Sequence, residues 1–429
     1  MEHDQPFAGI RVVEFGQFIA VPYCAQLLAE GGAYVVKIES LEGDPTRMMA
    51  PIEPGESRHF LSRNRGKHIL PLDLRSPGSQ RVIDALLASA DVVVTNFRPG
   101  LAEDFGLDYA TLSARYPRLI VGNVTAFGRK GPDALLAGFD PVVQARSGLA
   151  SALGHEVNGL PTASDPSLVD YMCAMTLAFG LSSALLRRER TGRGGEVTAS
   201  LLMAALTLQN TAMTRVDVAD RAEQEQVLAE LADARERGVS FAEQAGMMPL
   251  NKMNWMNTIY LRTYMTKDRP IAVACAGPKL HAAFLRATGL SDAWLGRAAA
   301  EDRSAFGAHY AQLKGEFEAV LAARPAAEWK VVFEREGVPH AEMKFPLEML
   351  FDEQTDANGM VRDVEHPTLG TARVLGSPVT MDGDGFVAVS PSAAFGSEVG
   401  GILRDAGFTA DEIEGLLASG VSRDHWRGK

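Results

Sequence analysis

Residues 161–202 read PTASDPSLVDYMCAMTLAFGLSSALLRRERTGRGGEVTASLL, and the rest of the chain is organised around this stretch. Ser164, Asp165 and Pro166 are typical of a helix start, because a short polar side chain caps free amides and proline suits the first turn. An apolar run follows and ends in the charged residues 187–190, whose cations suit the negative end of a helix dipole. Glycines at 192, 194 and 195 then break the helix. The stretch predicts a long buried helix, followed by a strand or a second helix from residue 196.

Asp170 is the unusual residue of this helix, since it places a carboxylate near the start of an apolar run. A structural role explains it, because acidic residues favour the first turn, where amides are unpaired and the dipole is positive. The alternative is a nucleophile that those amides hold ionised and that its apolar neighbours partly dehydrate. The local pattern leaves both interpretations open.

The composition is that of a soluble globular protein of two or three domains, with 429 residues, 46% hydrophobic and 22% charged. A net charge of -12 argues against a nucleic-acid partner, because phosphate backbones need clustered lysine and arginine. Small anionic ligands stay possible, since they need only a local cluster of donors. Cys24, Cys173 and Cys275 lie far apart without a CxxC pair, so we expect buried thiols, with no disulfide framework and no zinc site.

The location of the protein is predicted from two segments. Residues 1–6 are acidic and lack the basic and apolar regions of a signal peptide. The most apolar run, 171–186, is slightly too short to span a bilayer and contains Thr176, Ser182 and Ser183, so a buried core helix explains it better. We expect a cytoplasmic protein with no membrane partner.

The first half of the chain alternates strand and helix patterns. Apolar, β-rich runs at 10–15, 33–38, 67–74, 91–95 and 119–124 are interleaved with helical patterns at 22–30 and 79–90. Repeated βα units predict an α/β fold with a Rossmann-like, mainly parallel sheet covered by helices. A dinucleotide site is disfavoured, because the turn after residue 15 has one glycine where the fingerprint needs three.

The loop at residues 96–100 directly follows the strand at 91–95. Ligands of parallel sheets bind at the carboxyl ends of the strands, so this loop is expected to line a site. Arg98 and Arg75 are candidates for phosphate contacts there, although solvated surface arginines would give the same pattern.

The second half has a different character. A charged helix is expected at 217–238, a methionine-rich core or interface segment at 246–255, strands within 260–275, and helices at 280–289 and 317–337. Two short helices near 397–406 and 410–419 close the chain. No HExxH, GxSxG or Walker A motif occurs, so zinc hydrolase, serine hydrolase and P-loop functions lack support and no metal is expected.

Several short motifs together resemble the class III CoA-transferases, a family that includes formyl-CoA and carnitine CoA-transferases and is related in fold to α-methylacyl-CoA racemase. The matching segments, in order, are 9–15 with 32–39, GDPTR at 43–47, NRGK at 64–67 leading to LDL at 72–74, NFRPG at 96–100, GFD at 138–140 with QA at 144–145, RERTGRG at 188–194, GVP at 337–339 and GSP at 376–378. Each is short, but their shared order and spacing over most of the chain is specific.

The resemblance implies that Asp170 is the catalytic nucleophile, because family members carry their aspartate upstream of the RERTGRG segment. It would attack an acyl-CoA thioester and pass CoA, through an aspartyl-CoA thioester, to a carboxylic acid. CoA is then a substrate, and no permanently bound cofactor is expected. The positions that match CoA-contacting residues of the family are Ala20, Leu72, Arg75, Asn96, Phe97 and, as a phosphate partner, Arg98.

Five departures from the family pattern bear on function. Val21 and Asp104 stand where family members have a glycine and, in some, a phosphate-binding arginine. Phe139 replaces the histidine of the racemases and cannot move protons, which disfavours an acyl-CoA racemase or epimerase. The methionine-rich segment replaces the glycine-rich loop of oxalate-related enzymes, and Ser397-Glu398 replaces a Gly-x-His pattern.

By resemblance, the large domain combines residues 1–213 with 339–429, residues 214–239 form a linker helix, and residues 240–338 form the small domain. The family's interlocked homodimer is expected here as well. The rival to an enzyme is a CoA-binding protein that kept the scaffold without transfer activity, and the presence of Asp170 speaks against it.

Overall fold

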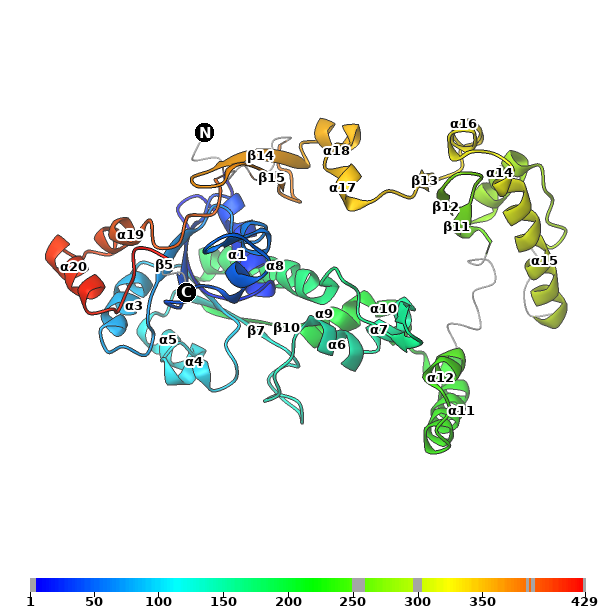
Figure 1. Ribbon diagram of the computed structural model, residues 1–429. Helices are drawn as coiled ribbons and strands as arrows, with labels where there is room; N and C mark the ends of the chain where they lie inside the picture. Colours follow the sequence, from blue (N-terminus) through cyan, green and yellow to red (C-terminus); the bar gives the residue numbers. More distant parts are fainter. Residues whose placement is uncertain (1–4, 249–258, 296–302, 383–385, 387–389, 427–429) are drawn as a thin grey trace. The chain divides into compact units, whose positions relative to one another are not determined.

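The computed structural model describes residues 5–248, 259–295, 303–382, 386 and 390–426. The chain folds into two compact units, one of Met1–Met213 with Glu353–Lys429 and one of Thr214–Asp352. Figure 1 labels the helices and strands of both units. Residues 249–255 of the methionine-rich segment lie outside the described residues.

The first unit is built on a six-stranded sheet in the order β10-β7-β6-β1-β2-β5. Every neighbouring pair in it is parallel, which confirms the predicted α/β architecture. The strands are β1 (Arg11–Phe15), β2 (Tyr34–Glu39), β5 (His68–Pro71), β6 (Val92–Thr95), β7 (Ile120–Thr125) and β10 (Gly195–Ser200).

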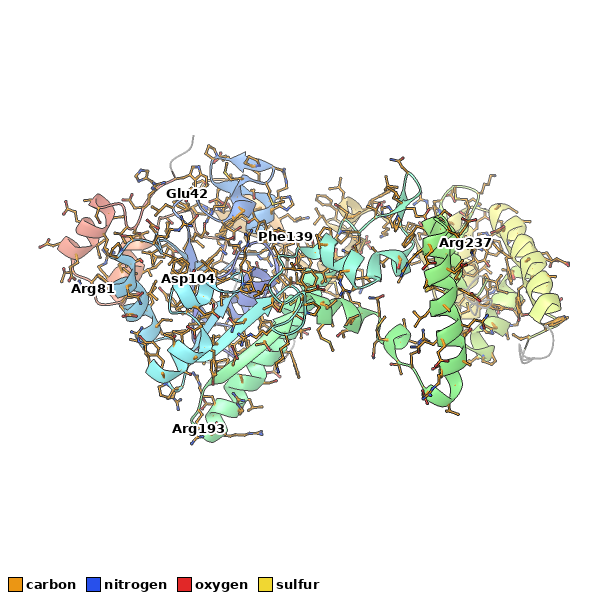
Figure 2. The ribbon with its side chains drawn as sticks, turned by 90° about the horizontal axis from the view of Figure 1, so that it is seen from below. Glu42, Arg81, Asp104, Phe139, Arg193 and Arg237 are labelled. Carbon is orange, nitrogen blue, oxygen red and sulfur yellow. The ribbon has the colours of Figure 1, made fainter. Side chains whose placement is uncertain are left out.

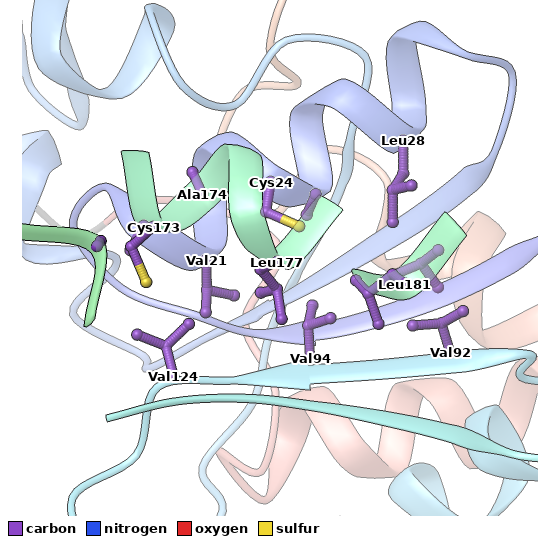
Figure 3. Close-up of a cluster of buried hydrophobic side chains, with 14 of the residues drawn as sticks. Val21, Cys24, Leu28, Val92, Val94, Val124, Cys173, Ala174, Leu177 and Leu181 are labelled. Carbon is purple, nitrogen blue, oxygen red and sulfur yellow. The ribbon is translucent and has the colours of Figure 1, made fainter. Parts of the chain in front are cut away.

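Helices cover both faces of this sheet. One core packs α1 (Ala20–Glu30), α8 (Leu168–Thr191) and α9 (Leu201–Leu208) against side chains such as Val92 and Val94. Figure 3 shows Leu177 and Leu181 of α8 next to these valines, with Cys24 and Leu28 of α1 in the same cluster. The opposite face carries α3 (Ser79–Ala88), α19 (Val399–Asp405) and α20 (Ala410–Ala418). Because successive strand side chains point to opposite faces, the continuous valine runs are buried on both sides.

Helix α8 differs from its prediction at its start. It begins at Leu168, and its N-cap residue Ser167 makes no side-chain capping bond, so the start expected at residues 164–166 is wrong. At 24 residues it is long and apolar enough to cross a membrane by length and composition. Its inner face, from Val169 through Leu185, is nevertheless buried in the core beside α1. We therefore interpret it as a core helix.

Shorter elements complete the first unit. They are η2 (Pro45–Met48), β3 (Pro51–Glu53), β4 (Glu56–Ser57), α2 (Arg58–Leu61), α4 (Leu101–Asp104), α5 (Tyr109–Arg115), α6 (Asp140–Arg146), α7 (Leu149–Leu153), β8 (Glu156–Val157), β9 (Leu160–Pro161), α10 (Asn210–Met213), α18 (Glu353–Ala357), β14 (Val361–His366) and β15 (Gly370–Leu375).

The second unit contains a three-stranded antiparallel sheet, β11-β12-β13, with its own aromatic core around Tyr264, Phe284 and Trp329. Its elements are α11 (Asp217–Glu236), α12 (Phe241–Gly246), β11 (Leu261–Met265), β12 (Pro270–Ala274), α14 (Pro278–Thr288), α15 (Arg303–Ala322), α16 (Ala326–Glu336), β13 (His340–Glu342) and α17 (Pro346–Met349). The prediction of a single helix at 317–337 is wrong. Pro325 separates α15 from α16, because proline lacks an amide donor and disfavours helical backbone in the residue before it.

Candidate active site

The carboxyl edge of the parallel sheet gathers the residues that the sequence singled out. The loops after β1, β5 and β6 leave the sheet there, and α1 and α8 run back along its face from their N-termini. Tyr23 of α1 and Tyr171 of α8 pack edge to face with ring centroids 4.9 Å apart. This contact places the first turns of the two helices side by side, and Asp170 lies in one of them.

Asp170 is partly buried, and its charge is disfavoured. Burial, reinforced by the nearby Asp140 carboxylate, raises the pKa of Asp170 to about 7, against the opposing effect of the Arg63 guanidinium. The sequence interpretation that the helix amides hold Asp170 ionised is wrong. The amides of Val169 and Asp170 donate instead to Oδ2 of Asp140, at 2.8 and 2.9 Å.

The sequence patterns did not single out Asp140 as a site residue. It begins α6 and is buried, with 3% of its surface exposed. Nε2 of Gln144 donates to its other oxygen, Oδ1, and Oε1 of Gln144 accepts a bond from the amide of Ser164 at 3.1 Å. Asp140 and Gln144 therefore tie α6 to the turn that enters α8. The Gly-Phe-Asp match at 138–140 was the available signal, but it carried no indication of this role.

Arg63 brings a positive charge to the same place. It follows α2, and its Nε donates to the hydroxyl of Tyr171 at 3.3 Å, while Nη1 donates to the carbonyl of His59 at 3.2 Å. No local sequence pattern indicates Arg63, because its contact with Tyr171 of α8 spans 108 residues. An arginine near a nucleophilic carboxylate can also receive an anionic substrate group.

Asn96 and Phe97 fix the loop between β1 and α1. The Asn96 side chain donates to the carbonyl of Gln17 at 2.8 Å and accepts from the backbone amide of Gln17 at 3.0 Å. The side chain thus pairs with Gln17 as a residue of a neighbouring β-strand would. The Phe97 ring lies between Phe15 and Phe105, each 5.9 Å away by centroid. This pair of residues therefore shapes the edge of the sheet.

The other four predicted CoA positions fall at the same edge with different exposure. Arg98 and Arg75 are exposed in the loops after β6 and β5. Ala20 begins α1, and Leu72 follows β5, and both side chains are buried in the core. Ala20 and Leu72 can therefore contribute to a ligand site only through their backbone atoms and through the shape that their buried side chains give to the edge of the sheet.

A cluster of buried ion pairs stabilises this edge of the sheet. Nζ of Lys37 lies 2.9 Å from Oε1 of Glu14 and donates to the carbonyl of Gly16 at 2.6 Å. Nζ of Lys67 lies 2.7 Å from Oε2 of Glu14 and donates to the carbonyl of Pro22 at 2.7 Å. Both lysines therefore hold the backbone of the β1–α1 connection. Losing one partner of a buried pair typically costs about 3–5 kcal/mol, because the other charge stays buried.

The same cluster explains two of the short sequence motifs. Asp44 of the GDPTR motif pairs with Lys37 at 3.0 Å, and Arg47 pairs with Glu39 at 2.8 Å. Lys67 comes from the NRGK motif and accounts for its lysine. These motif residues build the scaffold of the edge and do not face a ligand, since all are buried.

Two departures from the family pattern are visible in Figure 2. Phe139 precedes Asp140 and packs edge to face on Phe18, with centroids 5.2 Å apart, so an apolar ring stands where proton transfer would need an imidazole. Asp104 is exposed at the end of α4.

Metal ligation and thiol chemistry find no support in the described residues. No group of three or more histidine, cysteine, aspartate or glutamate side chains is placed there to hold a metal ion. All three cysteines are buried, and burial raises the pKa of the Cys173 thiol to about 12. Asp170 is thus the candidate nucleophile at this edge.

Comparison with known proteins assigns the family. The sequence profile described as CoA-transferase family III matches residues 7–393. The chain belongs to this family.

Relatives and solved structures agree with that assignment. Cinnamoyl-CoA:phenyllactate CoA-transferase of Clostridium sporogenes is 28% identical, over 96% of this chain and 95% of that protein. The probable fatty acyl-CoA transferase Rv3272 of Mycobacterium tuberculosis is 32% identical, over 78% of this chain and 81% of that protein. Its crystal structure superposes with a TM-score of 0.73 at 26% identity, over 92% and 98% of the two chains. A CaiB/BaiF family structure from Brucella suis gives 0.70 at 26% identity, over 94% and 99%. This class III CoA-transferase therefore acts on CoA thioesters.

Proposed function

We propose that this class III CoA-transferase moves CoA from an acyl-CoA to a carboxylic acid with Asp170 as its covalent nucleophile. The observation that carries the proposal is the position of Asp170. It is a partly buried carboxylate with a raised pKa, at the edge of a parallel sheet where ligands bind.

The chemistry follows in two half-reactions that need no metal or redox group. A carboxylate oxygen of Asp170 attacks the thioester carbon, the C–S bond breaks, and CoA leaves as thiolate with the electron pair. The thiolate then attacks Cγ of Asp170 in the resulting mixed anhydride, which releases the donor acid as a carboxylate and leaves an aspartyl-CoA thioester. An acceptor carboxylate reverses these steps, so that acceptor acyl-CoA leaves and Asp170 is restored.

Binding of CoA is proposed along the loops of the same edge. Arg75 and Arg98 would meet phosphates, while Ala20, Leu72, Asn96 and Phe97 would shape the groove for the adenine and pantetheine groups. Two observations support this arrangement. Both arginines are exposed, and the two hydrogen bonds between the Asn96 side chain and the backbone of Gln17 hold the loop in place. We also propose that the protein works in the cytoplasm as an interlocked homodimer.

The experiment is intact-mass spectrometry after incubation with a panel of acyl-CoAs, followed by peptide mapping. Wild type should gain an acyl or CoA adduct on Asp170 that hydroxylamine removes. Asp170→Asn should abolish it, whereas Asp165→Asn, an exposed acid near the same turn, should keep it. CoA binding without an adduct across the panel would contradict the transferase proposal. Deuterium loss from the α-carbon without an acceptor acid would favour an epimerase instead.

A further inference from the structure

Asp140 occupies the place at the start of α8 that an anion would otherwise take. Its Oδ2 accepts from two successive amides, of Val169 and Asp170, and its Oδ1 accepts from Gln144. All three partners are N–H donors, which is the pattern of an ionised carboxylate. Because Asp140 is buried and held at both oxygens, its charge is fixed in position.

The groups around Asp170 determine which of its two forms, charged or neutral, is favoured. From α6, Asp140 disfavours the charged form of Asp170, and from the segment after α2, Arg63 favours it. Cys173 lies one turn along α8 as a neutral thiol, and burial raises the pKa of Tyr23, the phenol of α1 that packs on Tyr171. The two amides that would have stabilised a charged Asp170 are already engaged.

We propose that Asp140 is a positioning residue that caps α8 and, through its fixed negative charge, activates the neighbouring Asp170 as a nucleophile. The inference rests on the proposed function and deepens it. When Asp170 becomes an anhydride or a thioester, its charge disappears, and so does its repulsion from Asp140. The repulsion therefore destabilises the free carboxylate of Asp170 but does not destabilise the covalent intermediates.

Two variants separate the charge of Asp140 from its structural role. Asp140→Asn keeps an oxygen for the helix amides and removes the charge, whereas Gln144→Met breaks the contact with Oδ1 and leaves the charge in place. Asp140→Glu restores the charge. Asp140→Ser is a second capping variant without charge, for use if the asparagine variant does not fold.

The readout is the pH dependence of Asp170, measured in two ways on the full chain. One is the rate of adduct formation on Asp170 from acyl-CoA in a single turnover. The other is carbodiimide-driven coupling of glycinamide to Asp170, followed by peptide mass mapping between pH 5 and 9, which needs no substrate. In wild type both profiles should have a midpoint near the raised pKa of about 7.

Asp140→Asn should move both midpoints down by about one pH unit, since a like charge has been removed, and should lower the plateau rate of adduct formation. Asp140→Glu and Gln144→Met should keep the wild-type midpoints. Unchanged midpoints in Asp140→Asn, or an equal movement in Gln144→Met, would overturn the proposal. The two proposals can fail separately. If wild type forms no adduct, but Asp140→Asn still moves the midpoint of the coupling assay, the proposed function is refuted and the electrostatic effect of Asp140 on Asp170 is retained.

Discussion

At Asp170, burial and Asp140 act in the same direction, since both disfavour the charged carboxylate that the chemistry needs. The folded protein raises the pKa of Asp170 to about 7, whereas in the unfolded chain the group titrates at its ordinary value of about 4. Between these pH values the folded state holds more protons than the unfolded state. The stability contributed by this difference is complete below about pH 4 and is lost as the pH rises through about 7.

Asp170→Asn should therefore be more stable than wild type at pH 8, by roughly 1–4 kcal/mol in the free energy of unfolding. The advantage should shrink towards pH 4.5, and urea unfolding at both pH values measures it. Asp108→Asn is the matched control. The Asp108 side chain caps α5, and its hydrogen bonds with Thr111 lower its pKa below the ordinary value of about 4. Because Asp108 is ionised at both pH values, this variant should lose the same stability at pH 8 and at pH 4.5. An Asp170→Asn advantage that is equal at both pH values would contradict the argument.

At the scale of elements, the sequence predicted what depends on local patterns. The valine runs and their spacing predicted parallel strands, and the glycines after residue 190 correctly predicted the end of α8. The cap of α8 was mispredicted because Asp140 lies 29 residues before Val169, and no local pattern shows which side chain will meet those amides. The buried Lys37 and Lys67 escaped prediction as scaffold residues for the same reason, since their partners come from other strands and loops.

The turn between α8 and β10 is a second element whose packing explains its sequence. A Cβ on Gly194 would lie 2.0 Å from the carbonyl oxygen of Leu119 and 2.6 Å from the carbonyl carbon of Arg118. Both are backbone atoms just before β7, so moving a side chain cannot relieve the clash. The glycine lets β10 approach β7 and continue the parallel ladder from Gly195 onward.

Gly194→Ala should consequently lower the free energy of unfolding by about 1–3 kcal/mol or more, because the added methyl group forces β10 away from β7. Chemical denaturation measures the loss, and hydrogen exchange should show faster opening of β10. The control is Gly401→Ala in α19, where an added Cβ meets no atom within 4 Å and helix propensity favours alanine. Equal stability of the two variants would mean that the strands do not approach so closely.

At the scale of the whole molecule, the outer face of α8 requires an explanation. Met175, Phe179 and Leu186 follow one another along a single stripe of the helix and are exposed in the single chain, Phe179 by 75%. Exposed apolar side chains of this size along one face of a helix usually mark an interface. A second copy of the chain is the partner that the proposed homodimer supplies.

Two measurements test this interface together. Light scattering should give twice the 46.1 kDa chain mass. A thiol placed by Phe179→Cys should react with maleimide far more slowly than one placed by Val218→Cys, a position on α11 that is 94% exposed. The three native cysteines are buried and should contribute little background. A chain of single mass would refute the dimer. A dimer in which both introduced thiols react equally fast would place the interface elsewhere and leave the stripe on α8 exposed.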